Sequence, residues 1–394
     1  MNQNTDFIPF SRPSTGIEEE EAAVRVIRSG WLTSGIEVKE FEKEFASYVG
    51  SKHALTVNSA TAGLHLSLEA MGIKKGDLVA TTPYTFTATA EVIRYLGADP
   101  VFVDIEEGSW NIDPEKLENT VKRNPGKIKA VIPVHMGGLH CRMDEICGIA
   151  KKYNLKILED AAHSFPVKTK KGFSGTIGDA GVYSFYANKT ITTGEGGMVV
   201  TNNDEIAKRV SVMRLHGIDR DVWNRYTSSE GSWKYAVVEA GFKYNMTDIA
   251  AAIGREQLKK ASLFNSQRKE IAEKYNESLK NWKFLEIPRR KEDNSWHLYI
   301  IRINKNKLTI NRDQFIECLK EESIGTSVHY IPLHIMPYYK KLYSLEKEDF
   351  PEAYKKYQQS ISIPIFPGMT ENQVSTVVSA IGRIGKKYQR TDND

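Results

Sequence analysis

Several features are scarce in this 394-residue sequence, and each absence excludes a class of protein. Its three cysteines, Cys141, Cys147 and Cys318, form no C-x-x-C pair, so we expect neither a disulfide framework nor a zinc site, and a cytoplasmic location fits. No run of about 18 apolar residues occurs, and the N-terminus lacks a basic region followed by an apolar one. We therefore expect neither membrane association nor secretion.

Charge and phosphate motifs are equally sparse. The formal net charge of +4 is small for this length, so nucleic acid and acidic membranes are not expected partners. Neither G-x-x-x-x-G-K-[ST] nor G-x-G-x-x-G occurs, which disfavours a nucleoside triphosphate or a dinucleotide as ligand. The composition, 40% hydrophobic and 26% charged, is that of an ordinary globular protein with a sizeable core.

The first two thirds of the chain alternates short apolar strands with amphipathic helices. After helices near 16–30 and 38–48, we predict strands near 54–57, 78–82, 100–103, 130–134, 156–160, 181–185 and 198–201, and helices near 61–71, 87–96, 114–121 and 143–153. This alternation predicts an α/β fold with a mainly parallel central sheet covered by helices on both faces. Ligands of such sheets bind beyond the carboxyl ends of the strands.

The last third has a different pattern. A long helical stretch begins near residue 246 and continues towards 280, and it is followed by strands near 296–303 and 327–331 and by helices near 312–322, 352–360 and 371–385. We therefore expect a large domain over residues 1–265 and a smaller C-terminal α+β domain over residues 266–394.

One lysine stands at the join between a strand and a glycine-rich bend. Lys189 lies within G-V-Y-S-F-Y-A-N-K-T-I-T-T-G-E-G-G, residues 181–197, and a new apolar strand follows the glycines. Such a lysine could serve as a Schiff-base amine. The alternative is an exposed loop lysine, as most lysines are.

An acid ends the strand K-I-L-E-D, and A-A-H follows it. At the carboxyl end of a parallel strand, Asp160 could hold the positive charge of a heteroaromatic nitrogen, as a pyridoxal phosphate (PLP) site requires. Its alternative role is to cap the following turn or helix. Three residues further on, His163 could be catalytic or a structural histidine.

Small and hydroxylated residues join the strand near 54–57 to the next helix. Backbone N–H groups at that helix start, with the hydroxyls of Ser59 and Thr61, could hold a phosphate, although the same residues could simply cap the helix. Ser184 could add another hydroxyl or be an ordinary strand residue. Phe86 could stack on a planar ring or belong to the core.

Taken together, these segments resemble the DegT/DnrJ/StrS family of sugar aminotransferases, which are PLP enzymes of fold type I. The resemblance covers nearly the whole chain and follows the family's order: F-S-R-P at 10–13, S-G-W-L-T-S-G at 29–35, S-A-T-A-G-L-H at 59–65, P-Y-T-F-T-A-T at 83–89, V-F-V-D at 101–104, E-D-A-A-H at 159–163, S-F-Y-A-N-K-T-I-T-T-G-E-G-G at 184–197 and Y-I-P-L-H at 330–334.

The resemblance implies roles for individual residues. Lys189 would bind PLP covalently and then move a proton between the sugar and the cofactor, and Asp160 would pair with the pyridinium nitrogen. Around them, Phe86 would stack on the ring, His163 would lie near the ring hydroxyl, and the phosphate would be held by Thr61, the Ala62 backbone and Ser184.

One position departs from the family pattern. Many members carry G-Y-N-Y-R before the long helix, whereas this chain has G-F-K-Y-N at 241–245, so Lys243 replaces an amide that reaches the cofactor phosphate of the neighbouring subunit. A lysine can still bind phosphate as a point charge, which would place shared active sites in a homodimer. The form G-x-K-Y-N resembles the branch that aminates 4-keto sugars on UDP, including the aminoarabinose aminotransferases.

The resemblance implies a PLP-dependent aminotransferase of polysaccharide biosynthesis that moves an amino group from glutamate to a nucleotide-linked keto sugar, at C4, by a ping-pong mechanism. His329, Tyr330 and His334 could line the sugar pocket, or serve as packing or surface residues. Two alternatives are a PLP-dependent nucleotide-sugar dehydratase, in which a histidine replaces the Schiff-base lysine, and a non-catalytic regulatory protein that retains the fold. The presence of Lys189 argues against the dehydratase.

Overall fold

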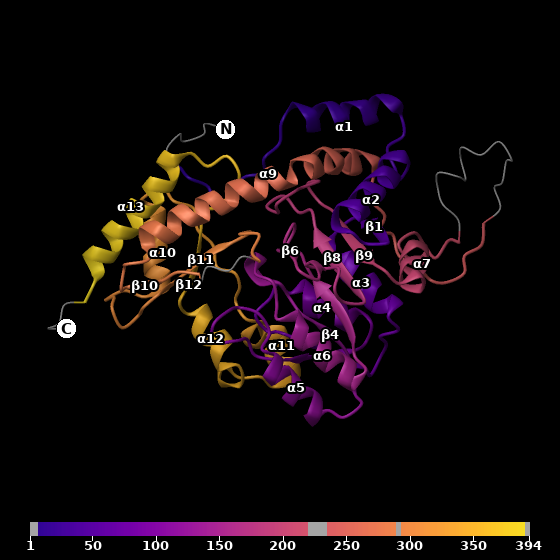
Figure 1. Ribbon diagram of the computed structural model, residues 1–394. Coiled ribbons are helices and arrows are strands. Elements are labelled where there is room, and N and C mark those ends of the chain that lie inside the picture. Colours follow the sequence, from indigo (N-terminus) through magenta and orange to yellow (C-terminus); the bar gives the residue numbers. More distant parts are fainter. Residues whose placement is uncertain (1–6, 220–234, 289–292, 391–394) are drawn as a thin grey trace.

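A computed structural model describes residues 7–219, 235–288 and 293–390 of the chain (Figure 1). Its centre is a seven-stranded sheet in the order β1-β9-β8-β5-β4-β2-β3. The strands are β1 (His53–Val57), β2 (Leu78–Thr81), β3 (Asp99–Phe102), β4 (Ile128–Ile132), β5 (Lys156–Asp160), β8 (Ala180–Ser184) and β9 (Gly197–Thr201).

The sheet is mainly parallel, as the sequence predicts. From β3 through β2, β4 and β5 to β8 every neighbouring pair is parallel, and only β9 pairs antiparallel, with β8 on one side and β1 on the other. All five residues of β9 are buried, and its composition G-M-V-V-T is what a strand covered on both faces requires. The carboxyl ends of β2, β4, β5 and β8 therefore meet at one edge of the sheet.

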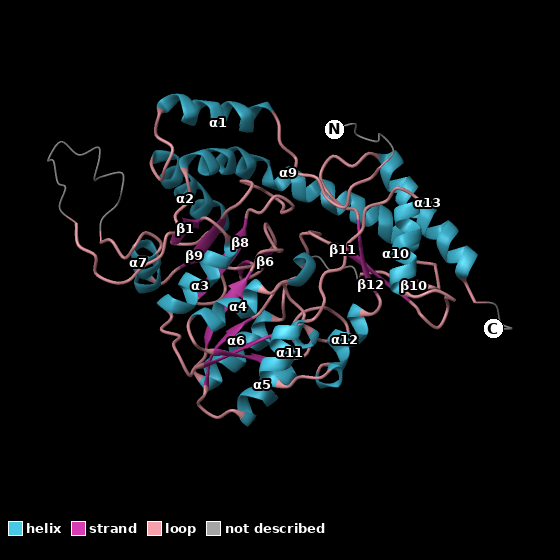
Figure 2. Cartoon of the chain, turned by 180° about the vertical axis from the view of Figure 1, so that it is seen from behind, coloured by secondary structure: helices cyan, strands magenta, loops and turns pink. Residues whose placement is uncertain are grey.

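Helices cover both faces of the sheet (Figure 2). Helices α3 (Ala60–Ala70), α4 (Ala88–Tyr95) and α7 (Asp204–Met213) pack on one face. The other face is covered by α2 (Ile36–Val49), α5 (Pro114–Arg123), α6 (Met143–Tyr153) and the long helix α9 (Asp248–Leu279). Helix α7 was not predicted, although Asn203 caps it by accepting the N–H groups of Glu205 and Ile206.

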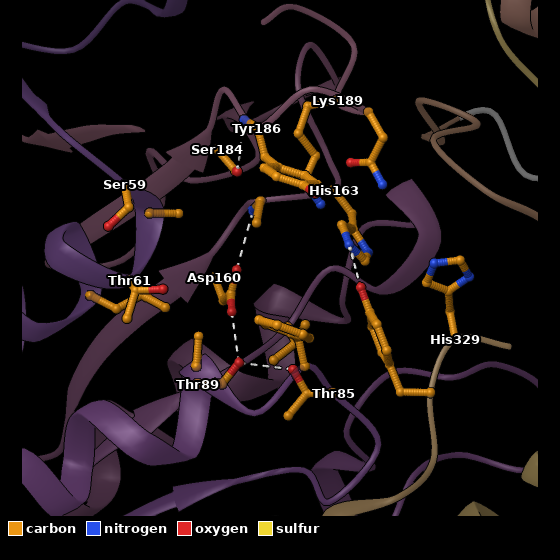
Figure 3. A pocket seen from close by; sticks show the side chains of 18 of the residues that line it. Ser59, Thr61, Thr85, Thr89, Asp160, His163, Ser184, Tyr186, Lys189 and His329 are labelled. Carbon is orange, nitrogen blue, oxygen red and sulfur yellow. Dashed lines mark hydrogen bonds between the residues drawn. The ribbon is translucent and has the colours of Figure 1, made fainter. Parts of the chain in front are cut away.

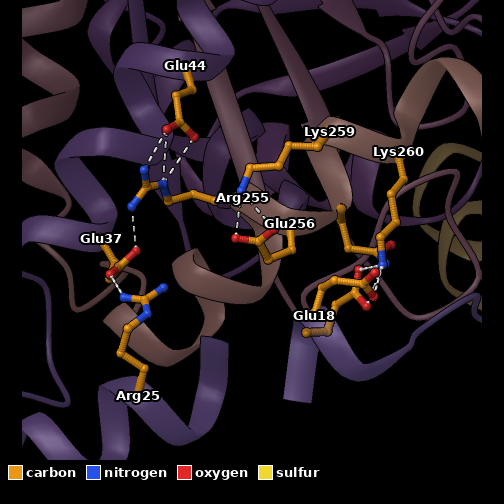
Figure 4. Close-up of polar contacts among 10 residues, drawn as sticks. Glu18, Arg25, Glu37, Glu44, Arg255, Glu256, Lys259 and Lys260 are labelled. Carbon is orange, nitrogen blue, oxygen red and sulfur yellow. Dashed lines mark hydrogen bonds and ion pairs between the residues drawn. The ribbon is translucent and has the colours of Figure 1, made fainter. Parts of the chain in front are cut away.

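Ion pairs connect the N-terminal helices to α9 (Figure 4). Arg255 of α9 contacts Glu37 and Glu44 of α2 at 2.7 and 2.6 Å, and Lys260 contacts Glu19 of α1 (Ile17–Ser29) at 2.8 Å. Asp248, the first residue of α9, accepts the N–H group of Gly35 at 2.7 Å. These contacts hold both helices against the start of α9.

The C-terminal part of the chain forms a smaller unit around a three-stranded antiparallel sheet, β10-β11-β12. Its elements are β10 (Leu285–Glu286), β11 (Tyr299–Ile303), α10 (Arg312–Glu321), α11 (Pro337–Tyr343), α12 (Pro351–Tyr357), β12 (Ser360–Ile363) and α13 (Glu371–Tyr388). The strand predicted near 327–331 is wrong, because only Ser327 makes an isolated bridge, to Ser362. The predicted helix near 352–360 ends earlier, and its last residue begins β12.

Helix α9 joins the two units (Figure 1). Its first half packs against the large sheet through Leu258 and Phe264, and its second half packs in the core of the smaller unit through Ile271 and Tyr275. We propose that the division into residues 1–265 and 266–394 falls within this helix. None of the helices in the described ranges is both long and apolar enough to cross a membrane.

Candidate active site

A cavity of about 460 Å³ lies beyond the carboxyl ends of the central strands (Figure 3). Large-unit residues on its wall include Ser59, Thr61, Thr85, Phe86, Thr89, Asp160, His163, Ser184, Tyr186 and Lys189, and the smaller unit contributes His329 and Tyr330. The predicted lysine, acid, aromatic and hydroxyl residues therefore share one cavity although they come from separate segments.

Asp160 ends β5 and is buried in the wall of this cavity. Its Oδ2 atom accepts the hydroxyl of Thr89 at 2.8 Å, its Oδ1 atom accepts the N–H group of Ala162 at 3.2 Å, and Thr85 contacts Thr89 at 2.8 Å. Burial raises the pKa of Asp160, and these hydrogen bonds and the nearby Lys189 partly oppose that shift. A carboxylate held in this way can stabilise a cationic ring nitrogen.

Lys189 follows β8 in a turn in which its N–H group donates to the carbonyl of Tyr186 at 2.9 Å. The loss of hydration lowers the pKa of the amine to about 7, with Asp160 opposing the shift and Arg268 adding to it. Near neutral pH a substantial fraction of the amine is therefore uncharged, which is the form that attacks a carbonyl carbon.

His163 is buried between the two units. Its Nδ1 atom accepts the N–H group of Gly137 at 3.2 Å, and its Nε2 atom lies 3.1 Å from the hydroxyl of Tyr330. Burial holds the pKa of His163 well below its usual range, and the charge of Lys189 adds to that effect. The ring is therefore neutral and, since Nδ1 is an acceptor, it carries its proton on Nε2 and donates to Tyr330.

The start of α3 forms another part of the cavity wall. Ser59 is the N-cap, and its Oγ atom accepts the N–H group of Ala62 at 3.1 Å, so this amide caps the helix. Thr61 and Ser59 line the cavity, as does Ser184, whose Oγ atom accepts the N–H group of Tyr186 at 3.3 Å. Hydroxyls beside a helix N-terminus are suited to a phosphate.

Phe86 lies on the wall of the same cavity with 57% of its surface exposed. Its ring centroid is 5.7 Å from that of Tyr330. His329 also reaches the cavity, and its Nδ1 atom contacts the hydroxyl of Ser362 at 2.9 Å. Burial lowers the pKa of His329 to about 3, so its ring is neutral.

Three of the predicted site residues, Ala62, Lys243 and His334, are not among the residues that line this cavity. Lys243 is exposed outside it, and its carbonyl accepts the side-chain amide of Asn58 at 3.4 Å. His334 is fully buried, and its ring packs 4.9 Å from that of Phe350.

No sequence pattern singles out His297, yet its Nε2 atom lies 3.5 Å from Nζ of Lys189. Its ring centroid is 4.4 Å from that of His163. Burial holds the pKa of His297 well below its usual range. His297 lies 108 residues from Lys189, just before β11, so no local motif connects the two.

Comparisons with known proteins show similarity over nearly the whole chain. The model of the DegT/DnrJ/EryC1/StrS aminotransferase family matches residues 13–382. An uncharacterized protein of Methanocaldococcus jannaschii is 51% identical over 96% of this chain and 97% of its own. The spore coat polysaccharide biosynthesis protein SpsC of Bacillus subtilis is 44% identical over 98% of this chain and 99% of its own.

A solved structure is similar over the whole fold. Spr1654 from Streptococcus pneumoniae, assigned as a sugar aminotransferase, was solved in a pyridoxamine phosphate form that superposes with a TM-score of 0.89 at 30% identity, over 96% of this chain and 99% of that one. The PLP form of Spr1654 superposes with a TM-score of 0.88.

Proposed function

Because the chain belongs to the DegT/DnrJ/EryC1/StrS aminotransferase family, and is a PLP-dependent sugar aminotransferase, we propose that it moves an amino group from glutamate to C4 of a nucleotide-linked keto sugar. The observation that carries the site assignment is that Lys189 and Asp160, which follow neighbouring parallel strands, lie on the wall of one cavity.

The residues around the cavity fit PLP. A buried carboxylate, a partly uncharged lysine amine, and hydroxyls at a helix start are the three kinds of group that its ring nitrogen, aldehyde and phosphate require. Lys189 would hold the cofactor, Asp160 would face its ring nitrogen, and Phe86 would lie against the ring. We assign the phosphate to Ser59, Thr61 and Ser184, and to the Ala62 amide only if the Ser59 cap is released.

When bound, PLP supplies an electron sink for the carbon atom that loses a proton. The role of the protein is to move that proton. The Lys189 amine is uncharged in a substantial fraction near neutral pH and can accept a proton from the donor and later return one to the sugar, as a ping-pong exchange at a single site requires. His163 donates to Tyr330 and thereby holds this phenol at the cavity wall.

The sugar would enter from the side where the smaller unit closes the cavity. His329 and Tyr330 are the contacts that we propose for it, and His334 would support them from within the core. The similarity to SpsC, a spore coat polysaccharide biosynthesis protein, supports a sugar destined for a polysaccharide. Lys243, in place of an amide, supports a 4-keto sugar on UDP.

We propose a cytoplasmic homodimer with shared active sites. Lys243 is exposed and lies outside the cavity of its own chain, which suits a contact with the cofactor phosphate of a partner. Apolar side chains of the N-terminal helices are also exposed, among them Ile17 at 59% and Ile27 at 57%.

The test is incubation with PLP, glutamate and a panel of UDP-, dTDP- and GDP-linked 3-keto and 4-keto sugars, with mass spectrometry of the products. We expect a 4-amino sugar on UDP together with 2-oxoglutarate. Loss of a sugar hydroxyl without gain of an amine would instead indicate dehydration. A protein that binds no PLP and changes no substrate would be the regulatory alternative.

A further inference from the structure

A buried cation lies behind the active site without a carboxylate to balance it. Arg268 of α9 is 1% exposed, and within the described ranges no Asp or Glu oxygen lies within 4.0 Å of its guanidinium. Burial lowers its pKa to about 10, so the group is still charged at pH 7. An unbalanced charge of this kind is costly and acts over a long range in a protein interior.

Among the residues that the structure describes, the guanidinium donates only to backbone carbonyls. Its Nη1 atom lies 2.8 Å from the carbonyl oxygen of Ile365, 3.3 Å from that of His297 and 3.4 Å from that of Trp296. Trp296 has a left-handed backbone with φ of 53°, which bulky residues rarely adopt. Arg268 therefore holds the turn that leads into β11.

This turn presents His297 to the active site. The imidazole Nε2 atom lies 3.5 Å from Nζ of Lys189 on one side, while Arg268 binds the carbonyl of the same residue. One residue thus connects α9 to the amine. Arg268 therefore fixes the backbone of His297, while the ring packs against that of His163 with 4.4 Å between the centroids.

We propose that Arg268 is a positioning residue for Lys189: it holds the turn that presents His297 to the amine, and its unbalanced charge acts on that amine. This inference rests on the proposed function for the importance of Lys189, but the geometry is independent of the cofactor.

Two charged groups act on the Lys189 amine with opposite effects. Asp160 at the end of β5 raises the pKa of Lys189, and Arg268 on α9 lowers it. The histidines that surround the amine, His163, His297 and His329, are all neutral because burial lowers their pKa values. Among charged groups, the pKa of Lys189 therefore depends on Asp160 and Arg268.

The experiment measures the apparent pKa of Lys189 in the full-length protein after PLP has been removed. Acetic anhydride labels uncharged amines, so the labelling rate of Lys189, followed by peptide mass spectrometry from pH 5 to 10, gives this value without any catalytic turnover. In the wild type we expect an apparent pKa of about 7. Arg268→Gln keeps a donor but removes the charge, and should raise the pKa by about 0.5 to 1 unit.

Two further variants separate charge from structure. Arg268→Lys keeps the charge and should leave the apparent pKa within about 0.3 unit of the wild type. Asn265→Asp leaves Arg268 in place but adds a carboxylate one helical turn away, and should raise the pKa as Arg268→Gln does. If Arg268→Gln does not fold, Asn265→Asp still tests the effect of charge on the pKa of Lys189.

The matched control is Arg312→Gln. Arg312 is also buried, and it also donates to backbone carbonyls, those of Tyr357 at 2.9 Å and Ser360 at 3.2 Å, but it is not among the groups that shift Lys189. It should leave the Lys189 pKa unchanged.

The proposal is overturned if folded Arg268→Gln and Asn265→Asp both show the same apparent pKa of Lys189 as the wild type. It is also overturned if Arg268→Lys shifts this pKa as much as Arg268→Gln does. Because labelling needs no cofactor, the apparent pKa of Lys189 can still be measured if Lys189 does not bind PLP.

Discussion

The hydroxyl of Tyr330 lies 3.1 Å from Nε2 of His163, although the two residues are 167 positions apart in the chain. His163 follows β5 of the large sheet, and Tyr330 belongs to the smaller unit, so this hydrogen bond joins the two units at the cavity that both of them line. Its strength depends on a neutral histidine, which burial provides.

Removing this bond should weaken the closure of the cavity. We expect Tyr330→Phe to lower the free energy of unfolding by about 1 to 3 kcal/mol, because the buried N–H group of His163 loses its acceptor. Urea unfolding measures this change, with Tyr354→Phe as the control at a half-buried tyrosine. Equal loss in both variants would show that the bond to His163 is unimportant.

Lys189→Ala should abolish both covalent cofactor binding and transamination. Without the amine, borohydride reduction should no longer add the mass of PLP to the protein, and the rate of amine transfer should fall by about 1,000-fold or more. Lys168→Ala, which removes an exposed lysine, is the control. Retention of the mass addition in Lys189→Ala would assign the cofactor to another lysine.

Asp160→Asn should keep the acceptor for Thr89 but lose the negative charge that faces the cavity. We expect kcat to fall by about 100-fold or more, since the amide cannot stabilise a cationic ring nitrogen. The comparison variant is Thr89→Val, which removes the hydrogen bond and leaves the charge. A larger loss in Thr89→Val would mean that the orientation of Asp160 matters more than its charge.

The rate at which PLP binds to the cofactor-free protein should depend on pH through Lys189. Its pKa is lowered to about 7, so the reactive uncharged amine is the minor form at pH 6 and the major form at pH 8. We expect the rate to rise across this window and to level off above it, as measured by stopped-flow absorbance. A rate that continues to rise up to pH 10 would indicate an ordinary exposed lysine.

Shared active sites can be tested by mixing two inactive variants. In a heterodimer of Lys189→Ala and Lys243→Glu, one site combines the intact Lys189 of one chain with the intact Lys243 of the other. If sites are shared, mixing after mild denaturation should restore activity to about half that of the wild type per heterodimer. No recovery, with dimers confirmed by light scattering, would place Lys243 in the site of its own chain, and full activity of Lys243→Glu by itself would place it outside any site.

Much of the fold follows from local pattern. The strands ending at Asp160 and Ser184 and the helix capped by Ser59 were predictable because burial on both faces and helix capping leave signals within a few residues. The strand predicted at 327–331 is wrong because it also rested on local pattern alone. In the structure this segment instead places His329 and Tyr330 on the cavity wall.

The sequence by itself predicted the kind of ligand that the site could hold, since Lys189, Asp160 and the hydroxyls at the start of α3 lie in local motifs whose residue types limit what they can bind. Only the tertiary structure decided what surrounds the Lys189 amine. His297 reaches it from the turn before β11, and Arg268 of α9 binds the carbonyl of His297. Contacts between such distant segments arise from the packing of the two units, which no local pattern records. The same packing buries the amine and so lowers its pKa to about 7.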